Sequence, residues 1–152
     1  MIRKRATKRK AIDNEVCAVT ILGEPASKAN SRRIVRIGER VRSIKSHKAL
    51  NYAKGFEIQC PTRKEIFEED VAIAMKIFYR SRRPDLDESL ILDLLENKVY
   101  KNDRLVKYKS IEHGLDKEEP RTIIVISKLG NKELVVNKLK EILDIEKEEQ
   151  CK

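Results

Sequence analysis

The pattern of hydrophobic and polar positions along the chain predicts strands with helices between them. Residues 16–23 are rich in β-branched side chains and end at a glycine, which is typical of a strand that leads into a turn. Residues 71–79 are apolar on both faces, so we expect this segment to be a buried central strand. Two further strand candidates are residues 105–111 and 121–128.

Basic and apolar residues alternate over residues 33–44, around the dipeptide Gly38-Glu39. This alternation predicts a β-hairpin whose two-residue turn begins with glycine. We expect its basic side chains to line one face of the hairpin, which would then present a cationic surface.

Three amphipathic segments predict helices. Ser46 can cap the first, which Pro61 ends; the second covers residues 88–97, and the third follows Gly130. Their expected apolar positions are Ala49, Leu50, Ala53 and Phe56, then Leu90, Ile91, Leu94 and Leu95, then Leu134, Val135, Leu139 and Ile142. Together, the strands and helices predict an α+β domain in which a mixed β-sheet is flanked by helices.

The chain has 152 residues, which suits one compact domain. We expect a flexible basic arm at residues 1–12, a folded domain over residues 13–130, and a C-terminal helix and tail over residues 131–152. No apolar stretch is long enough to span a membrane, so a cytoplasmic protein without a membrane partner is expected. Three scattered cysteines and two histidines favour neither a disulfide framework nor a histidine-rich metal site.

Positive charge is concentrated in two segments of the chain. Residues 1–10 contain six bases and no acid, and residues 24–55 contain nine bases and two acids, although the whole chain carries a net charge of only +9. Such clustering favours a polyanionic partner, and nucleic acid is preferred to an anionic membrane because no apolar helix face accompanies the basic arm.

The most informative segment is Tyr79 to Glu88, where two aspartates follow the predicted central strand. In an extended backbone, Asp85 and Asp87 lie on the same side of the chain. A third acid, Asp103, follows the short predicted helix, and we expect that helix to bring it back beside the other two. Alternatively, Asp87 caps the helix and Asp103 is a turn residue.

Phosphate-binding side chains accompany these acids: Arg82, Arg83, Lys101 and Arg104. Carboxylates that bind Mg²⁺, next to cations that offset the charge of a phosphate, are what metal-assisted hydrolysis of a phosphodiester requires. A protein that only binds DNA would not need the acids, because they repel it.

At this point the sequence resembles the RusA family of Holliday junction resolvases, which are endonucleases of phages and bacteria. The matching segments are Gly23-Glu24-Pro25-Ala26-Ser27-Lys28-Ala29-Asn30, Lys45-Ser46, Arg83-Pro84-Asp85-Leu86-Asp87, Val99-Tyr100-Lys101-Asn102-Asp103 and Glu119-Pro120-Arg121. The resemblance implies a RusA-like nuclease domain and a homodimer that resolves four-way DNA junctions by paired symmetric nicks. A phage or bacterial origin would place the protein in the bacterial cytoplasm.

By this resemblance, Asp85, Asp87 and Asp103 carry both metal binding and catalysis, with Mg²⁺ as cofactor, Mn²⁺ as a substitute and no small-molecule cofactor. The expected DNA contacts are Lys28, Arg32, Arg33, Lys45, Lys48, Arg82, Arg83, Lys101 and Arg104. Many members carry a lysine needed for activity shortly after the Asp-Leu-Asp element, and no lysine occupies that place here. Lys101, Lys45 or Lys28 are candidates to supply the cation, and Glu88 is a candidate ligand.

Two other interpretations of the function stay open. Pro84-Asp85 followed by Glu96-Asn97-Lys98 formally matches the short motif of restriction-like nucleases, and the basic segments also suit a non-catalytic nucleic-acid-binding protein. His113 is a candidate general base, although a lone histidine at a strand end is more often structural.

Overall fold

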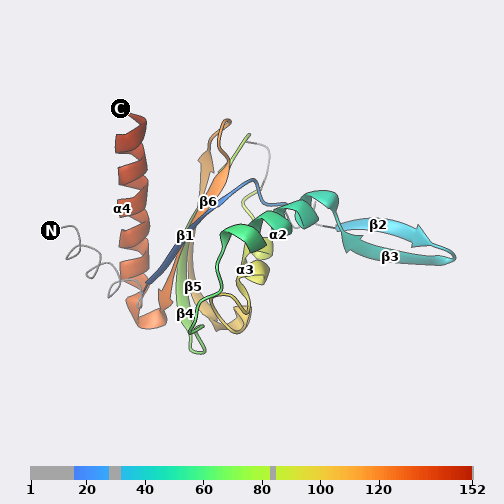
Figure 1. Ribbon diagram of the computed structural model, residues 1–152, viewed down its shortest axis with the longest axis horizontal. Helices are drawn as coiled ribbons and strands as arrows, with labels where there is room; N and C mark the ends of the chain where they lie inside the picture. The colour runs from blue at the N-terminus through green and yellow to red at the C-terminus, as the bar shows by residue number, and fades with distance from the viewer. Residues whose placement is uncertain (1–15, 28–31, 83–84, 152) are drawn as a thin grey trace.

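A mixed four-stranded sheet forms the centre of the protein (Figure 1). The computed structural model describes residues 16–27, 32–82 and 85–151. The strands of this sheet are β1 (Val16–Leu22), β4 (Val71–Tyr79), β5 (Val106–Leu115) and β6 (Arg121–Lys128), in the spatial order β1-β6-β4-β5. The expected α+β class is confirmed, and so is the central position of residues 71–79, because β4 pairs with a strand on each side.

The direction of the strands decides which loops can meet. β6 is antiparallel to both β1 and β4, whereas β5 is parallel to β4, with Val71 opposite Val106 and Tyr79 opposite Leu115. Parallel neighbours need a crossover connection, and the segment that contains α3 (Ser89–Leu95) supplies it. The first residues of β4 and β5 therefore lie at one end of the sheet, and their last residues lie at the other.

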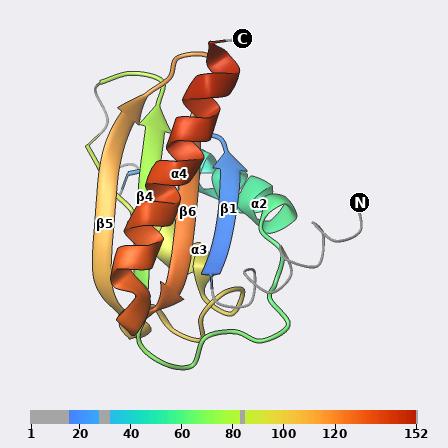
Figure 2. The same ribbon diagram turned by 90° about the vertical axis from the view of Figure 1, so that its left-hand side faces the viewer.

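Helices cover both faces of the sheet. α2 (His47–Gln59) and α3 lie on one face, and α4 (Lys132–Gln150) crosses the opposite face (Figures 1 and 2). β4 faces both layers, which explains why its sequence is apolar on both sides. None of the helices in the described part of the chain is long and apolar enough to cross a membrane.

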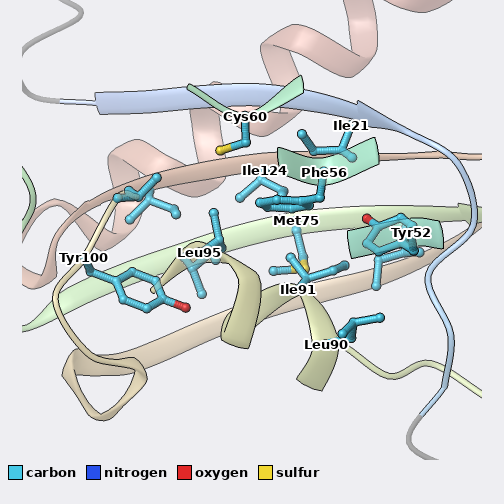
Figure 3. Packing of buried hydrophobic residues seen from close by; sticks show 14 of the residues in the cluster. Ile21, Tyr52, Phe56, Cys60, Met75, Leu90, Ile91, Leu95, Tyr100 and Ile124 are labelled. Carbon is cyan, nitrogen blue, oxygen red and sulfur yellow. The ribbon is translucent and has the colours of Figure 1, made fainter. Parts of the chain in front are cut away.

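The larger hydrophobic core lies under α2 and α3 (Figure 3). Phe56 of α2, Met75 of β4 and Leu95 of α3 are fully buried in it. Burying a side chain of this size contributes about 1.5–3 kcal/mol relative to exposing it. This core fixes α3 against the sheet, and α3 in turn positions the acids at its two ends.

The helices begin and end close to where the sequence indicates. The hydroxyl of Ser46 accepts a hydrogen bond of 3.2 Å from the amide of Ala49, so the expected cap of α2 is confirmed. Two of the assigned apolar positions were wrong: Leu50 of α2 is 40% exposed, and Leu134 of α4 is 42% exposed. Their places are taken by neighbours that do face the sheet, including the buried Tyr52.

The predicted hairpin is confirmed as β2 (Arg32–Ile37) and β3 (Arg40–Lys45), which project away from the sheet (Figure 1). Gly38 opens the turn with φ +63°, a backbone conformation that glycine adopts without a steric penalty. The expectation that the bases line one face was wrong. Paired residues of an antiparallel ladder share a face, and this register places three bases on each.

Candidate functional site

The acids of the Asp-Leu-Asp element follow directly after β4. Tyr79 ends this strand and is 1% exposed. Its hydroxyl donates a hydrogen bond to the carbonyl oxygen of Asp85 and accepts one from the backbone amide of Asp87, each at 3.3 Å. One buried side chain therefore fixes the backbone at both acids.

The carboxylate of Asp87 is oriented by the first residue of α3. Its Oδ1 atom accepts hydrogen bonds from the backbone amide of Ser89 at 3.0 Å and from the Ser89 hydroxyl at 2.7 Å. The alternative in which Asp87 caps the helix was wrong: the N-cap of α3 is Glu88, which makes no side-chain cap hydrogen bond, and Asp87 lies one residue before it. Asp87 is half-buried and Asp85 is exposed, so a solvent-borne ligand can reach this pair.

Two further acids lie near the Tyr79 hydroxyl, and each is paired with a cation. Glu24 follows β1 and accepts hydrogen bonds of 2.8 Å from the ammonium of Lys48 and from the backbone amide of Arg80. Glu88 accepts a bond of 2.8 Å from Lys109 of β5. Segments far apart in the sequence therefore place acids and cations together at the start of α3.

The surroundings of Tyr79 keep its phenol protonated. Burial raises the pKa of Tyr79 above its usual value and outweighs the hydrogen bond from the Asp87 amide, which lowers it; the negative charges of Asp87, Glu24 and Glu88 raise it further. The hydroxyl consequently stays available as a donor to the Asp85 carbonyl. Burial would also raise the pKa of Glu24, but Lys48 and Arg80 hold it below its usual range.

His113 lies against the tyrosine that holds both acids. Its ring stacks on Tyr79 with 5.0 Å between centroids and 24° between planes. His113 is exposed, and alternation along β5 places it on the same face as Lys109. This contact gives the histidine a structural role beside the acids without removing it from solvent.

Asp103 lies at the other end of α3. It opens a short 3₁₀ turn, η1 (Asp103–Leu105), and its backbone amide donates a hydrogen bond of 2.9 Å to Glu96, directly after α3. α3 has seven residues, so at about 1.5 Å per residue some 10 Å of helix separates the two groups of acids. The expected return of Asp103 to the start of the helix does not occur within one chain.

The parallel pairing of β4 and β5 explains this separation. Asp103 precedes β5, whose first residue, Val106, lies opposite the first residue of β4, whereas Asp85 and Asp87 follow the last residue of β4. Within residues 16–27, 32–82 and 85–151, no three His, Cys, Asp or Glu side chains lie close enough to hold a metal ion together. The chain thus brings together Asp85 and Asp87, and places Asp103 at the other end of α3.

A pocket of about 170 Å³ adjoins the start of α3. It is lined by Arg32 and Lys45 from the base of the hairpin and by Ser89 and Asp93 from α3, with Ala26, Ala49 and Leu90 as its apolar walls. Because the hydroxyl of Ser89 also binds Asp87, this pocket places two of the expected DNA-contacting cations close to the acids.

The other expected DNA contacts are spread along the surface. Arg33 and Arg82 are exposed, and Lys48 is paired with Glu24. Lys101 and Arg104 are exposed beside Asp103, at the far end of α3. Lys28 and Arg83 lie outside the described residues.

Three lysines were candidates to replace the lysine that many members of the family carry and this chain lacks. Of the candidates named from sequence, Lys45 lines the pocket beside Ser89, Lys101 lies with Asp103, and Lys28 is not described. Sequence reasoning missed Lys109 as a cation of this region, and it missed Glu24 as a partner of the segment after β4. The signal for Glu24 was its place in the first matching segment, as an acid within a basic stretch.

The geometry of Lys98 argues against the restriction-like motif. Its ammonium is nearly buried, donates a hydrogen bond of 3.0 Å to the carbonyl oxygen of Cys60 and lies 3.1 Å from Glu57. Glu96 accepts the amide of Asp103. Both residues of that motif thus lie at the opposite end of α3 from Asp85.

Comparison with known proteins adds no assignment: no protein-family model matches this sequence, and no curated protein matches it either.

Proposed function

We propose that this protein is a Mg²⁺-dependent, structure-specific endodeoxyribonuclease that resolves four-way DNA junctions as a homodimer. The observation that carries the proposal is that the hydroxyl of one buried tyrosine, Tyr79, hydrogen-bonds to the backbone of both acids of the Asp-Leu-Asp element. Because Tyr79 ends the central strand, Asp85 and Asp87 project from a fixed point of the fold, as a reaction that depends on exact positioning requires.

The donor chemistry of this pair fits Mg²⁺. Mg²⁺ prefers oxygen ligands and is commonly bound by one or two carboxylates together with waters and a substrate phosphate. Asp85 and the oriented carboxylate of Asp87 would hold it, and Glu88 is a further candidate ligand. When bound, the ion lowers the pKa of a coordinated water and offsets charge on the phosphate.

The side chains around the acids would position the DNA. Arg32 and Lys45 line the adjoining pocket and would bind a backbone phosphate next to the one that is cut. Lys48 and Lys109 compensate Glu24 and Glu88, which reduces the repulsion that a polyanion meets at this surface. The chain itself thus binds and orients the phosphodiester while the acids supply the ligands.

A homodimer suits the proposed substrate. A four-way junction has two-fold symmetry, and its resolution needs symmetric nicks in two strands, so two identical sites related by a two-fold axis match it. Within one protomer Asp103 is separated from Asp85 and Asp87 by α3. A third carboxylate from Asp103 can therefore join the pair if it comes from the second copy.

The test is cleavage of a synthetic four-way junction with Mg²⁺, compared with the same reaction in EDTA. We expect paired nicks that require the metal, and we expect Asp85→Asn to abolish cleavage while junction binding in EDTA is retained. Asp144→Asn, an exposed acid of α4 on the opposite face of the sheet, is the matched control and should cleave normally. Normal turnover by Asp85→Asn would reject the proposed site.

The second candidate is a non-catalytic protein that binds branched DNA. The observation that favours it is the lack of a three-ligand metal group in the described part of a single chain. An unchanged junction both with Mg²⁺ and in EDTA, together with tight binding, would support this alternative.

A further inference from the structure

The even division of charge between the two faces of the β2–β3 hairpin indicates how it would bind DNA. Arg32, Arg36 and Lys45 lie on one face, and Arg33, Arg40 and Arg42 lie on the other, as the pairing register dictates. We propose that this two-stranded ribbon enters a groove of duplex DNA, with each face toward one of the two phosphate backbones that border the groove. The inference rests on the DNA partner of the proposed function and adds the mode of binding.

The position of the ribbon supports insertion. Within the described residues, β2 and β3 pair only with each other, and they extend away from the sheet and its helices (Figure 1). Their basic side chains are exposed on both faces. A ribbon of this kind can be surrounded on two sides, whereas a strand pair that lies on the sheet offers one side only.

The dimensions also agree. Each strand has six residues, so the ribbon is about 20 Å long at roughly 3.4 Å per residue. The major groove of B-form DNA is about 12 Å wide and admits a two-stranded β-ribbon. We therefore assign the major groove as the site of insertion.

Exposed apolar side chains on the ribbon fit the same position. Ile34 is 77% exposed, Ile37 60% and Val41 68%. An isolated two-stranded hairpin is only marginally stable in water, so a ribbon with this much uncovered apolar surface gains from a partner. These side chains lie on the same two faces as the bases, so insertion into a groove would cover them with the groove walls and remove them from bulk water.

Charge selects the partner. The ribbon carries six bases and one acid, Glu39, so pairing with the ribbon of a second copy would bring strong like charges together. A membrane surface is disfavoured because each face mixes bases with apolar residues, and neither is a continuous apolar face that lipid could cover. A groove with phosphates on both sides satisfies both faces at once.

The experiment compares one base from each face. Arg36→Gln and Arg42→Gln, which lie on opposite faces, are measured alone and together on a plain duplex in EDTA, by fluorescence anisotropy over a range of salt concentrations. We expect each to lower the slope of log affinity against log salt by about 0.9, or about eightfold in affinity at 0.1 M salt if the difference vanishes at 1 M, and the double variant to lose about twice that slope. Lys140→Gln on α4 is the matched control and should leave the slope unchanged.

Several outcomes would overturn the inference. An effect of Arg36→Gln without one of Arg42→Gln, or the reverse, would show that the ribbon lies on DNA by one face. If neither variant changes binding, the ribbon is not part of the DNA interface. If both single variants instead lose binding to phosphatidylserine vesicles to the same extent and bind duplex as the wild type does, the partner is a membrane.

A second measurement locates the groove. We expect methyl green, which occupies the major groove, to compete with the protein for duplex, and netropsin, which occupies the minor groove, to compete little; the opposite ranking would contradict the major-groove assignment. Because binding is measured in EDTA, it does not depend on catalysis. If the separate assay with Mg²⁺ shows no cleavage while this binding pattern is intact, the nuclease is rejected and the inference stands. Thermal unfolding checks that each variant is folded.

Discussion

The two ends of α3 carry acids of different character. At its start, Asp87 and Glu88 lie among cations and near the exposed Asp85, and the hydroxyl of the buried Tyr79 ties the backbone of both aspartates to the core. At its end, Asp103 belongs to a loop that is bound to the core through the fully buried Tyr100, whose backbone bridges Phe67 and Glu96. The acids at the start reach solvent, whereas Tyr100 holds the loop at the end against the core.

The electrostatics of two tyrosines show the same difference. Burial raises the pKa of Tyr100, and the charges of Asp103, Glu96 and Asp93 raise it further. Its hydroxyl donates to the carbonyl oxygen of Leu92, within the helix. Tyr79 instead binds the backbone of the acids themselves. Each end thus has a buried phenol surrounded by acids, but only at the start does the phenol position the acids of the proposed site.

Among the variants that compare the two ends of α3, the largest effect is expected from Asp103→Asn. The resemblance implies three carboxylates, so loss of the third should reduce cleavage by about a thousandfold, which corresponds to about 4 kcal/mol of transition-state stabilisation. Because α3 lies between Asp103 and Asp87 in the single chain, we propose that the two acids share a site across a dimer. Cleavage of a four-way junction measures the loss.

Mixed dimers decide whether the site is shared. In a dimer of one Asp87→Asn chain and one Asp103→Asn chain, a shared arrangement leaves one intact site, so we expect recovery of single nicks without paired resolution. Two differently tagged chains, co-expressed and purified through both tags, provide this dimer. An inactive mixed dimer would place Asp103 in the site of its own chain, and full activity of Asp103→Asn alone would confine it to the loop.

A large loss of stability is expected from Leu95→Ala at the end of α3. Leu95 is fully buried, and truncating a buried leucine costs about 2–5 kcal/mol, a large part of the stability of an ordinary domain. Leu86, between the two acids near the start, is 40% exposed, so Leu86→Ala should cost less than about 1 kcal/mol. Urea unfolding of both variants measures the contrast. Equal losses would contradict the view that Leu95 is held in the core while Leu86 faces solvent.

Local signals explain which parts of the fold the sequence predicts. The apolar run of residues 71–79, the glycine of the Gly38-Glu39 turn and the cap at Ser46 each depend on a few neighbouring residues, and each is confirmed. The sequence alone could also have predicted which bases lie on each face of the hairpin. Once the turn is fixed, Arg33 and Arg36 differ by an odd number of positions and must lie on opposite faces.

The place of Asp103 could not be read in the same way. Its distance from Asp85 depends on the direction of β5 relative to β4 and on the length of α3 between them, and no local pattern states the pairing of two strands. Lys109 and Glu24 were missed for the same reason, because they reach the start of α3 from β5 and from the loop after β1. The sequence indicates which residue types carry the chemistry, and the topology decides which of them meet.

A moderate effect is expected from Ser89→Ala at the start of α3. The change removes the hydrogen bond from the Ser89 hydroxyl to Asp87 but keeps the one from the backbone amide. We expect a loss of about 1 kcal/mol, seen as about a fivefold fall in kcat with KM little changed, because the carboxylate is less well oriented. Ser89→Thr keeps a hydroxyl and should restore activity. A Thr variant as slow as the Ala variant would argue against a positioning role.

The smallest effect is expected from Glu24→Gln, which tests the acids paired with cations at the start of α3. The pKa of Glu24 is lowered in the folded protein from its ordinary value of 4.5, because the stabilising contacts of Lys48 and Arg80 outweigh burial. A depressed pKa means that the charged carboxylate stabilises the fold; this contribution is complete well above pH 4.5 and is lost as the pH falls through the lower folded value. Unfolding in urea at pH 7 and at pH 3.5 should therefore show the variant less stable by under about 1 kcal/mol at neutral pH, with the difference shrinking in acid.

Lys48→Met, which removes one cation and keeps the acid, should show a smaller change of the same sign. If the difference between the wild type and Glu24→Gln instead widened toward acid, Glu24 would be destabilised in its charged form, and the start of α3 would not be the charge-compensated surface that the proposed DNA contact needs.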